Sequence, residues 1–265
     1  MNAPHYTTLT FEDKNGIAVV TFNRPDQLNA MNRRMMEEII DAVNRIHLSD
    51  TVRVGVLTGA GRAFMAGADI KEYARQTREE FISFQTLGRQ LYAALEGNEK
   101  PIIAAINGHA FGGGLEIALA CDMIVAAEGA KMGLPEILLN LIPGGGGTQR
   151  LPRKLGPTLA AELVLSGRTA TAEELHARGL INHLYPRERF HEATLAFAAT
   201  FADKSPEALQ ILKQLVQLAH GPTNPAHQAI ENEALARFYQ SKPGQAKIRE
   251  FLDKSEARAR EKAVK

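Results

Sequence analysis

The chain has 265 residues, of which 45% are hydrophobic and 23% charged, values that are ordinary for a soluble globular protein and that exclude a disordered chain. The chain has 31 lysine and arginine residues and 30 aspartate and glutamate residues, so its net charge is +1. This balance provides no general attraction to nucleic acid or to an anionic membrane. The single cysteine, Cys121, can neither close an intrachain disulfide nor build a cysteine-based metal site.

The N-terminal residues 1–5 lack the basic and apolar blocks of a secretory signal. The most apolar stretch, residues 102–127, is interrupted by glycines and by charged side chains, so it is not expected to span a membrane. We therefore expect a cytoplasmic protein.

The first elements in chain order are a hairpin and a helix. Asn15-Gly16 predicts a tight turn, and residues 17–22 predict the return strand. From Asn32 onward the apolar residues recur at helical spacing, which predicts a helix with one buried face.

A strand and a glycine-bearing loop then occur twice. Residues 53–59 are followed by the loop at 66–68, and residues 102–108 by the loop at 112–114, with a helix predicted over about 79–95. Alternation of strands and helices favours an α/β fold with parallel strand pairing.

Towards the C-terminus the pattern becomes helical. Thr171 and Glu174 have the spacing of a capping box, and Gly179 is a suitable stop for that helix. Further helices are predicted over residues 187–203, 206–219, 225–239 and 243–262. We predict an α/β core over residues 1–195 that contains the active site and a helical oligomerisation region over residues 196–265, whose polar last helix would dock on a partner subunit.

Two glycine-rich stretches, residues 66–71 and 112–116, concentrate backbone N–H groups that no side chain covers. If both stretches supplied donors to one oxygen, they would form an oxyanion hole. Taken singly, each stretch is more commonly explained by a tight turn or by close helix packing. A dinucleotide fingerprint is excluded, because Ile117 and Gln149 stand where its third glycine belongs.

Two glutamates lie among apolar residues. Glu116 follows the glycines of the second stretch, and Glu136 follows Gly133-Leu134-Pro135. Apolar surroundings raise the pKa of a carboxyl group and suit it to proton transfer, although each could instead be a cap or an ion-pair partner. The eight scattered histidines predict no metal site, and Cys121 is expected in the core.

Taken together, these stretches resemble the crotonase (enoyl-CoA hydratase/isomerase) superfamily over nearly the whole chain, more weakly after about residue 190. The segments that carry the resemblance follow in family order: 23–30 (NRPDQLNA), 63–71 (AFMAGADIK), 101–108 (PIIAAING), 110–118 (AFGGGLEIA), 133–137 (GLPEI), 142–151 (IPGGGGTQRL), 165–167 (LSG) and 177–181 (ARGLI).

The resemblance implies a spiral of strand-strand-helix units with a C-terminal helical trimerisation region, assembled as a homotrimer or homohexamer. It implies an acyl-CoA thioester as substrate, with the thioester oxygen bound by the amides of Ala68 and Gly113. The other implied CoA contacts are Leu28, Ala66, Asp69, Ile70, Lys71 and, from a neighbouring subunit, Lys254.

Hydratases of this family use two glutamates, and Glu116 and Glu136 match those positions. The resemblance thus implies water addition to a trans-2-enoyl-CoA, with no cofactor beyond the CoA of the substrate and no metal. Leu115 and Leu134 stand where hydratases often carry cysteine and glutamine, which leaves the chain-length preference open. Alternatives within the family are an enoyl-CoA isomerase or another acyl-CoA enzyme, such as a hydratase tuned to branched or aromatic acyl groups. An alternative of another class is a non-catalytic protein that binds acyl-CoA or RNA. The basic residues of the C-terminal run at 258–265 are interleaved with Glu256 and Glu261, as on a solvated helix face.

Overall fold

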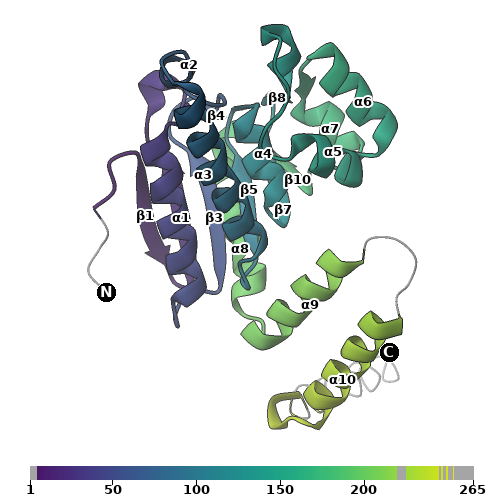
Figure 1. The fold of residues 1–265 in the computed structure, drawn as a ribbon. Helices are drawn as coiled ribbons and strands as arrows, with labels where there is room; N and C mark the ends of the chain where they lie inside the picture. The colour runs from purple at the N-terminus through teal and green to yellow at the C-terminus, as the bar shows by residue number, and fades with distance from the viewer. Residues whose placement is uncertain (1–4, 220–224, 245, 247–248, 250–252, 254–265) are drawn as a thin grey trace. The chain divides into compact units, whose positions relative to one another are not determined.

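The computed structural model describes residues 5–219, 225–244, 246, 249 and 253 (Figure 1). The chain divides into two compact units, Met1–Pro206 and Glu207–Lys265, and each is described by itself.

The first unit is built around a six-stranded sheet. Its strands lie in the order β1 (Leu9–Lys14), β2 (Ile17–Phe22), β3 (Val54–Gly59), β5 (Ile102–Ile106), β7 (Met123–Ala127) and β10 (His183–Tyr185). Asn15 and Gly16 have φ angles of 56° and 87°, as the predicted hairpin turn between β1 and β2 requires. From β2 onward every pairing in this sheet is parallel, which confirms the α/β prediction.

Alternate residues of the central strands face opposite sides of this sheet. Val20, Leu57 and Ala104 belong to a large core with the helices on one face, whereas Val19 and Val56 pack under the helix on the other face. Because both faces are covered, these strands carry apolar side chains at nearly every position.

A second, four-stranded sheet consists of β4 (Ala63–Met65), β6 (His109–Phe111), β8 (Lys131–Gly133) and β9 (Ala170–Thr171). Each of β3, β5 and β7 is followed within a few residues by a short strand of this sheet and then by a helix. The sequence predicted no strands at 63–65, 109–111 and 131–133, because three-residue strands have no periodicity to detect. The resulting repeat is the predicted strand-strand-helix spiral.

The helices of the first unit cover the sheets. They are α1 (Arg33–Leu48), α2 (Ile70–Tyr73), α3 (Arg78–Glu96), α4 (Gly113–Ala120), α5 (Gly147–Leu155), α6 (Pro157–Ser166), α7 (Ala172–Ala177) and α8 (Phe190–Ala202), with 3-10 turns η1 (Pro25–Gln27), η2 (Pro135–Leu139) and η3 (Arg187–Arg189). The helices α1 and α3 pack side by side on one face of the larger sheet, and α8 packs on the other (Figure 1). The predicted helix after Asn32 is confirmed as α1, and the side chain of Asn32 caps it by accepting a hydrogen bond from the amide of Met35.

The short helix α4 is buried on all sides, as expected for a helix that is apolar all round. Residues 114–120 are all buried, and Cys121 follows them in the core, as predicted. Its thiol lies 3.3 Å from the carbonyl oxygen of Ile117. Glu116 is the single charged side chain in this helix.

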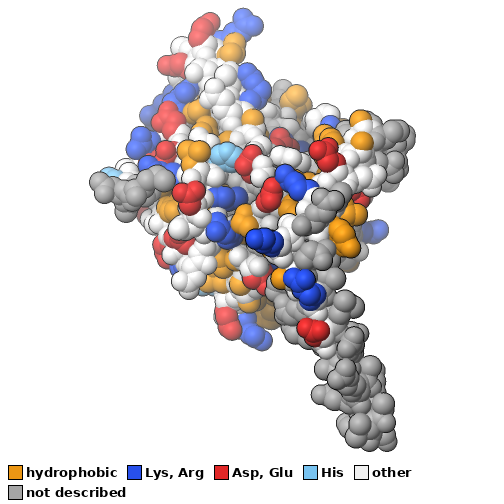
Figure 2. Space-filling model, turned by 90° about the horizontal axis from the view of Figure 1, so that it is seen from below, with side chains coloured by type: hydrophobic (Ala, Val, Ile, Leu, Met, Phe, Trp, Pro, Cys, Tyr) orange, Lys and Arg blue, Asp and Glu red, His pale blue; other side chains and the backbone are white. Residues whose placement is uncertain are grey.

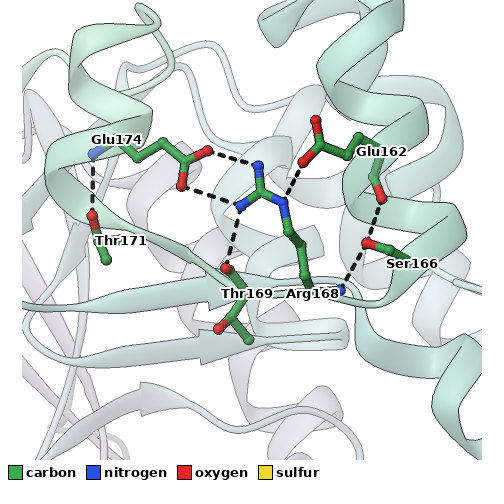
Figure 3. A network of polar contacts seen from close by, with 6 residues as sticks. All are labelled: Glu162, Ser166, Arg168, Thr169, Thr171 and Glu174. Carbon is green, nitrogen blue, oxygen red and sulfur yellow. Dashed lines mark hydrogen bonds and ion pairs between the residues drawn. The ribbon is translucent and has the colours of Figure 1, made fainter.

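A polar network joins α6, β9 and α7 (Figure 3). Thr171 caps α7 as predicted, but the carboxylate of Glu174 does not complete the capping box; it accepts two hydrogen bonds from the guanidinium of Arg168. Arg168 also donates to Glu162, and its amide donates to the hydroxyl of Ser166. The guanidinium provided a stronger, bidentate partner for Glu174 than one backbone amide could.

The second unit contains α9 (Pro206–Leu218) and α10 (Pro225–Gln240), joined by an ion pair of 2.9 Å between Arg237 and Glu207. The domain boundary predicted at 195/196 divides α8, whose Phe190 and Ala198 belong to the core under the larger sheet. The predicted helix over 243–262, the basic residues at 258–265 and Lys254 lie largely or wholly outside the described residues. Among the residues that the structure describes, no helix combines the length and apolar character needed to cross a membrane.

Candidate active site

A cavity of about 420 Å³ lies in the first unit, a volume typical of small-molecule sites. Its lining comes from the segments that carry the glycine-rich motifs, from one face of α3, and from α1. Four residues singled out by sequence as the catalytic set, Ala68, Gly113, Glu116 and Glu136, all line this one cavity.

Two backbone amides approach each other at the cavity wall. The amide nitrogen of Ala68 lies 3.9 Å from the position that a Cβ on Gly113 would occupy. Gly113 is the first residue of α4, where a helix leaves its N–H groups without intrahelical acceptors. The neighbours of Ala68 are held in place, since Met31 donates to the carbonyl of Gly67 and accepts from the amide of Asp69. The site therefore offers two backbone donors at a helix N-terminus, where negative charge is favoured.

Glu116 is only 3% exposed, and one of its oxygens is held firmly. Oε1 accepts hydrogen bonds of 2.8 Å from the amides of both Gly145 and Gly147. Burial raises the pKa of Glu116 above its usual range, while the two amide donors and the guanidinium of Arg150 oppose that rise.

Glu136 lies in the first turn of η2 and points towards the glycines of α4. Its Oε1 is 2.9 Å from the position that a Cβ on Gly112 would take, so the carboxyl group occupies space that only a glycine leaves free. Gly112 also has a φ of 50°, which other residues rarely adopt. Within the described part of the chain, the buried Oε2 of Glu136 has no hydrogen-bond partner. Burial raises the pKa of Glu136 to about 7, and the charge of Glu116 adds to the rise.

The loop that holds Glu116 is itself clamped by Arg150. The guanidinium of Arg150 donates to the carbonyl of Gly145 and forms two hydrogen bonds, of 2.7 and 2.6 Å, with the carboxylate of Glu96. The same guanidinium lies 5.3 Å from the ring centre of Tyr92, which packs against Gly145. Arg150 thus ties the glycine loop to α3 and fixes the amides that position Glu116.

The turn that carries Glu136 rests on the end of α6. A Cβ on Gly167 would come within 2.8 Å of Ile137 and 2.9 Å of Leu138, so η2 packs directly on this position. Arg168, the next residue, is held by the network of Figure 3. The glycine loop fixed by Arg150 therefore holds Glu116, whereas the end of α6 supports the turn that carries Glu136.

The predicted CoA contacts are divided between two places. Ala66 and Ile70 line the cavity with Ala68 and Gly113, whereas Asp69 and Lys71 line a neighbouring surface groove beside the start of α1. Asp69 forms a 2.9 Å ion pair with Arg24 and caps α2, which gives its carboxylate a structural role.

Leu28 does not belong to the lining of the cavity; its carbonyl accepts a hydrogen bond from the amide of Ala66 and holds that segment in position. Lys254 lies outside the described residues.

Sequence reasoning missed the wall formed by α3. Phe81, Phe84, Gln85, Gly88 and Tyr92 all line the cavity and recur at helical spacing. The spacing was visible in the sequence, but periodicity alone does not distinguish a face that covers a ligand site from one that packs on the core. Leu139 and residues 141–145 also line the cavity.

Among the described residues, no group of three or more histidine, cysteine, aspartate or glutamate side chains is arranged to hold a metal ion. The cavity wall carries two backbone donors and two carboxyl groups, a combination that can bind an oxyanion and transfer protons.

Fold and site together have the layout of a crotonase-type enzyme, and comparison with known proteins agrees. The family model "Enoyl-CoA hydratase/isomerase" matches residues 12–262, so the chain belongs to the enoyl-CoA hydratase/isomerase family.

Named relatives and solved structures are similar over most of their length. A 2,3-dehydroadipyl-CoA hydratase of Escherichia coli is 37% identical over 90% of this chain and 92% of its own. A crotonyl-CoA hydratase of Syntrophomonas wolfei is 34% identical over 95% and 97%. The crystal structure of an enoyl-CoA hydratase from Bacillus anthracis aligns with a TM-score of 0.89 at 33% identity, covering 94% of this chain and 97% of that one.

Proposed function

We propose that the protein is an enoyl-CoA hydratase that adds water across the 2,3 double bond of a trans-2-enoyl-CoA and forms a 3-hydroxyacyl-CoA. The observation that carries this proposal is the presence of both Glu116 and Glu136 in one cavity with the amides of Ala68 and Gly113. The reaction needs an electrophilic β-carbon, a water molecule beside it, and a proton for the α-carbon.

The two amides supply the electrophilic activation. When they donate to the thioester oxygen, they draw electron density from the conjugated double bond and stabilise the enolate that forms on water addition. Backbone donors held rigidly before the reaction are effective for this task, and the loss of one such donor typically lowers a rate by about 100- to 1000-fold.

The two glutamates handle the protons. Glu116, ionised, takes one proton from water as the water oxygen bonds to Cβ and the π electrons move to the thioester oxygen. Glu136, protonated, gives its proton to Cα as the enolate collapses to the thioester. Transfer of the proton held by Glu116 back to Glu136 then restores both side chains.

The electrostatics of the site support this division of roles. Burial raises the pKa of both carboxyl groups, that of Glu136 to about 7. Only at Glu116 do two amide donors and the guanidinium of Arg150 oppose the rise, which supports assigning the ionised form to Glu116 and the protonated form to Glu136. Because the two carboxyl groups influence each other, the pH dependence of the rate reports on the pair.

Hydration of crotonyl-CoA, followed by the loss of absorbance of the conjugated thioester, tests the proposal. We expect Glu116→Gln and Glu136→Gln each to lower kcat at least about 100-fold, because each removes a proton-transfer group. The binding of crotonyl-CoA, measured by calorimetry, should change little. Glu128→Gln, at an exposed position outside the cavity, is the matched control. Near-wild-type rates in both cavity variants would contradict the assignment.

Other activities predict different products or ligands. An isomerase would convert a 3-enoyl-CoA to its 2-enoyl isomer; the presence of both glutamates favours hydration, and product analysis with 3-enoyl substrates separates the two. A role restricted to RNA binding would call for a basic stripe, whereas Figure 2 shows lysine and arginine side chains scattered among aspartate and glutamate on the face it displays.

The proposed reaction uses no cofactor beyond the CoA of the substrate, so activity should survive treatment with EDTA. We also propose a homotrimer or homohexamer, supported by the exposed apolar side chains of the second unit, among them Leu212, Val216 and Leu235. Light scattering on the purified protein tests the assembly.

A further inference from the structure

The cavity face of α3 contains one position without a side chain. Along this face, Phe84, Gly88 and Tyr92 follow one another at intervals of one helical turn. Gly88 stands between two aromatic residues, in the middle of a 19-residue helix.

Neither the backbone nor the packing requires a glycine at this position. Gly88 is helical, and no positive φ is recorded for it. A Cβ on Gly88 would lie 3.9 Å from Sδ of Met36 and 3.9 Å from Cε2 of Tyr92, which are ordinary contact distances. Glycine in a helix interior lowers the folding equilibrium roughly fivefold relative to alanine. The chain therefore loses stability at residue 88 without any local structural need.

Because Gly88 has no side chain, the space between Met36, Phe84 and Tyr92, here called the inner end of the cavity, stays free. The residues around Gly88 are almost completely buried: Met36 is 0% exposed, Phe84 3% and Tyr92 5%. The rim is different, with Ile70 at 54% and Ile142 at 78% exposed. The space beside Gly88 is thus bordered by buried side chains, whereas exposed side chains form the rim of the cavity.

This inner end is adjacent to the reacting groups. The hydroxyl of Tyr92 is 3.7 Å from the position of a Cβ on Gly113, the residue whose amide faces the thioester oxygen in the proposed reaction. An acyl chain with its thioester at Gly113 and its CoA outside the rim has its far end directed towards Tyr92 and Gly88. The walls that it meets there are aromatic and thioether side chains, which suit an unbranched hydrocarbon chain.

We propose that Gly88 determines the acyl-chain specificity of this enzyme: by leaving the inner end of the cavity open, it admits acyl chains several methylene groups longer than the crotonyl group. This inference rests on the proposed function. Met36 contributes, because its flexible side chain adjusts to the chain end.

The size of the effect follows from burial of methylene groups. Each methylene removed from water is worth roughly a fourfold gain in binding. A leucine at residue 88 brings four carbon atoms into the space beside Met36 and Tyr92 and excludes a similar length of acyl chain. We therefore expect the ratio of kcat/KM for trans-2-octenoyl-CoA to that for crotonyl-CoA to fall by up to about 250-fold in Gly88→Leu, four factors of about four.

The experiment compares the wild-type enzyme with Gly88→Ala, Gly88→Leu and a control, Gln90→Leu, which places the same side chain on an exposed position of α3. Hydration rates are measured with crotonyl-CoA and trans-2-octenoyl-CoA, and the affinities of butyryl-CoA and octanoyl-CoA by calorimetry. The wild type and Gln90→Leu should prefer the longer chain in both assays. Gly88→Ala should show a smaller loss of that preference than Gly88→Leu, with a melting temperature at or above that of the wild type.

The saturated ligands separate the two hypotheses. If no enoyl-CoA is hydrated, the proposed function fails, whereas loss of octanoyl-CoA affinity in the Gly88 variants still supports the role of Gly88. Equal losses for short and long chains in Gly88→Ala, or an unchanged ratio in Gly88→Leu, would overturn the inference. Should Gly88→Leu fail to fold, the comparison of Gly88→Ala with the wild type decides the matter.

Discussion

Glu136 should lower the stability of the folded protein at the pH where it works. Its carboxyl group is half-buried, and its Oε2 is buried without a hydrogen-bond partner among the described residues. Burial raises its pKa from an ordinary value of 4.5 to about 7. The variant Glu136→Gln keeps the size of the side chain and removes the charge, so it tests this cost directly.

The sign and the pH range follow from linkage. Below pH 4.5 the group is protonated in both the folded and the unfolded chain and contributes no difference. Between pH 4.5 and 7 the carboxyl group ionises in the unfolded chain but stays largely protonated in the folded chain, so the free energy of unfolding falls as pH rises. Above about pH 7 the group is ionised in both states, and the destabilisation has its full value. The pKa difference corresponds to at most about 3 kcal/mol, and partial exposure reduces this by screening to about 2 kcal/mol.

Thermal unfolding of wild type and Glu136→Gln at pH 5 and pH 8, at equal protein concentration, measures the effect. We expect the variant to melt about 4–8 °C higher at pH 8 and to differ much less at pH 5. Its hydration rate should be at least about 100-fold lower. A variant that melts below the wild type at pH 8 would refute the reasoning, because the carboxyl group would then be stabilised by its surroundings. Glu128→Gln again serves as the control.

The supports of the two glutamates give further predictions. Arg150→Met releases the carbonyl of Gly145, so we expect kcat for hydration to fall about tenfold with little change in KM; Arg153→Met, exposed on the same helix, should have no effect, and an unchanged kcat in Arg150→Met would argue against the clamp. Gly167→Ala adds a Cβ within 2.8 Å of Ile137, at a φ of 67° that disfavours other residues. Unfolding in urea should show a loss of about 1–3 kcal/mol, and stopped-flow assays a kcat at least about tenfold lower, because η2 shifts; wild-type values in both measurements would contradict the role of this turn.

The elements predicted with most success have local physical causes. The hairpin at Asn15-Gly16 follows from residues that tolerate positive φ, and the strand at Ile102–Ile106 follows from an apolar run bounded by a proline. The start of α4 after Gly112 could also be predicted, since glycines opened an otherwise apolar helix. The strands β4, β6 and β8 could not, because a three-residue strand is defined by its neighbours in the sheet and not by its own pattern.

By itself the sequence determined which residues were candidates for the chemistry, and the resemblance placed Glu116 and Glu136 among them. Only the tertiary structure decided that they share a cavity, that the amides of Gly145 and Gly147 converge on one carboxylate oxygen, and that one face of α3, with Gly88, lines the cavity. It also decided that Asp69 pairs with an arginine. The physical reason is that propensities and caps act between residues close in the chain, whereas burial, pKa and cavity shape depend on parts of the chain that meet only in the folded protein.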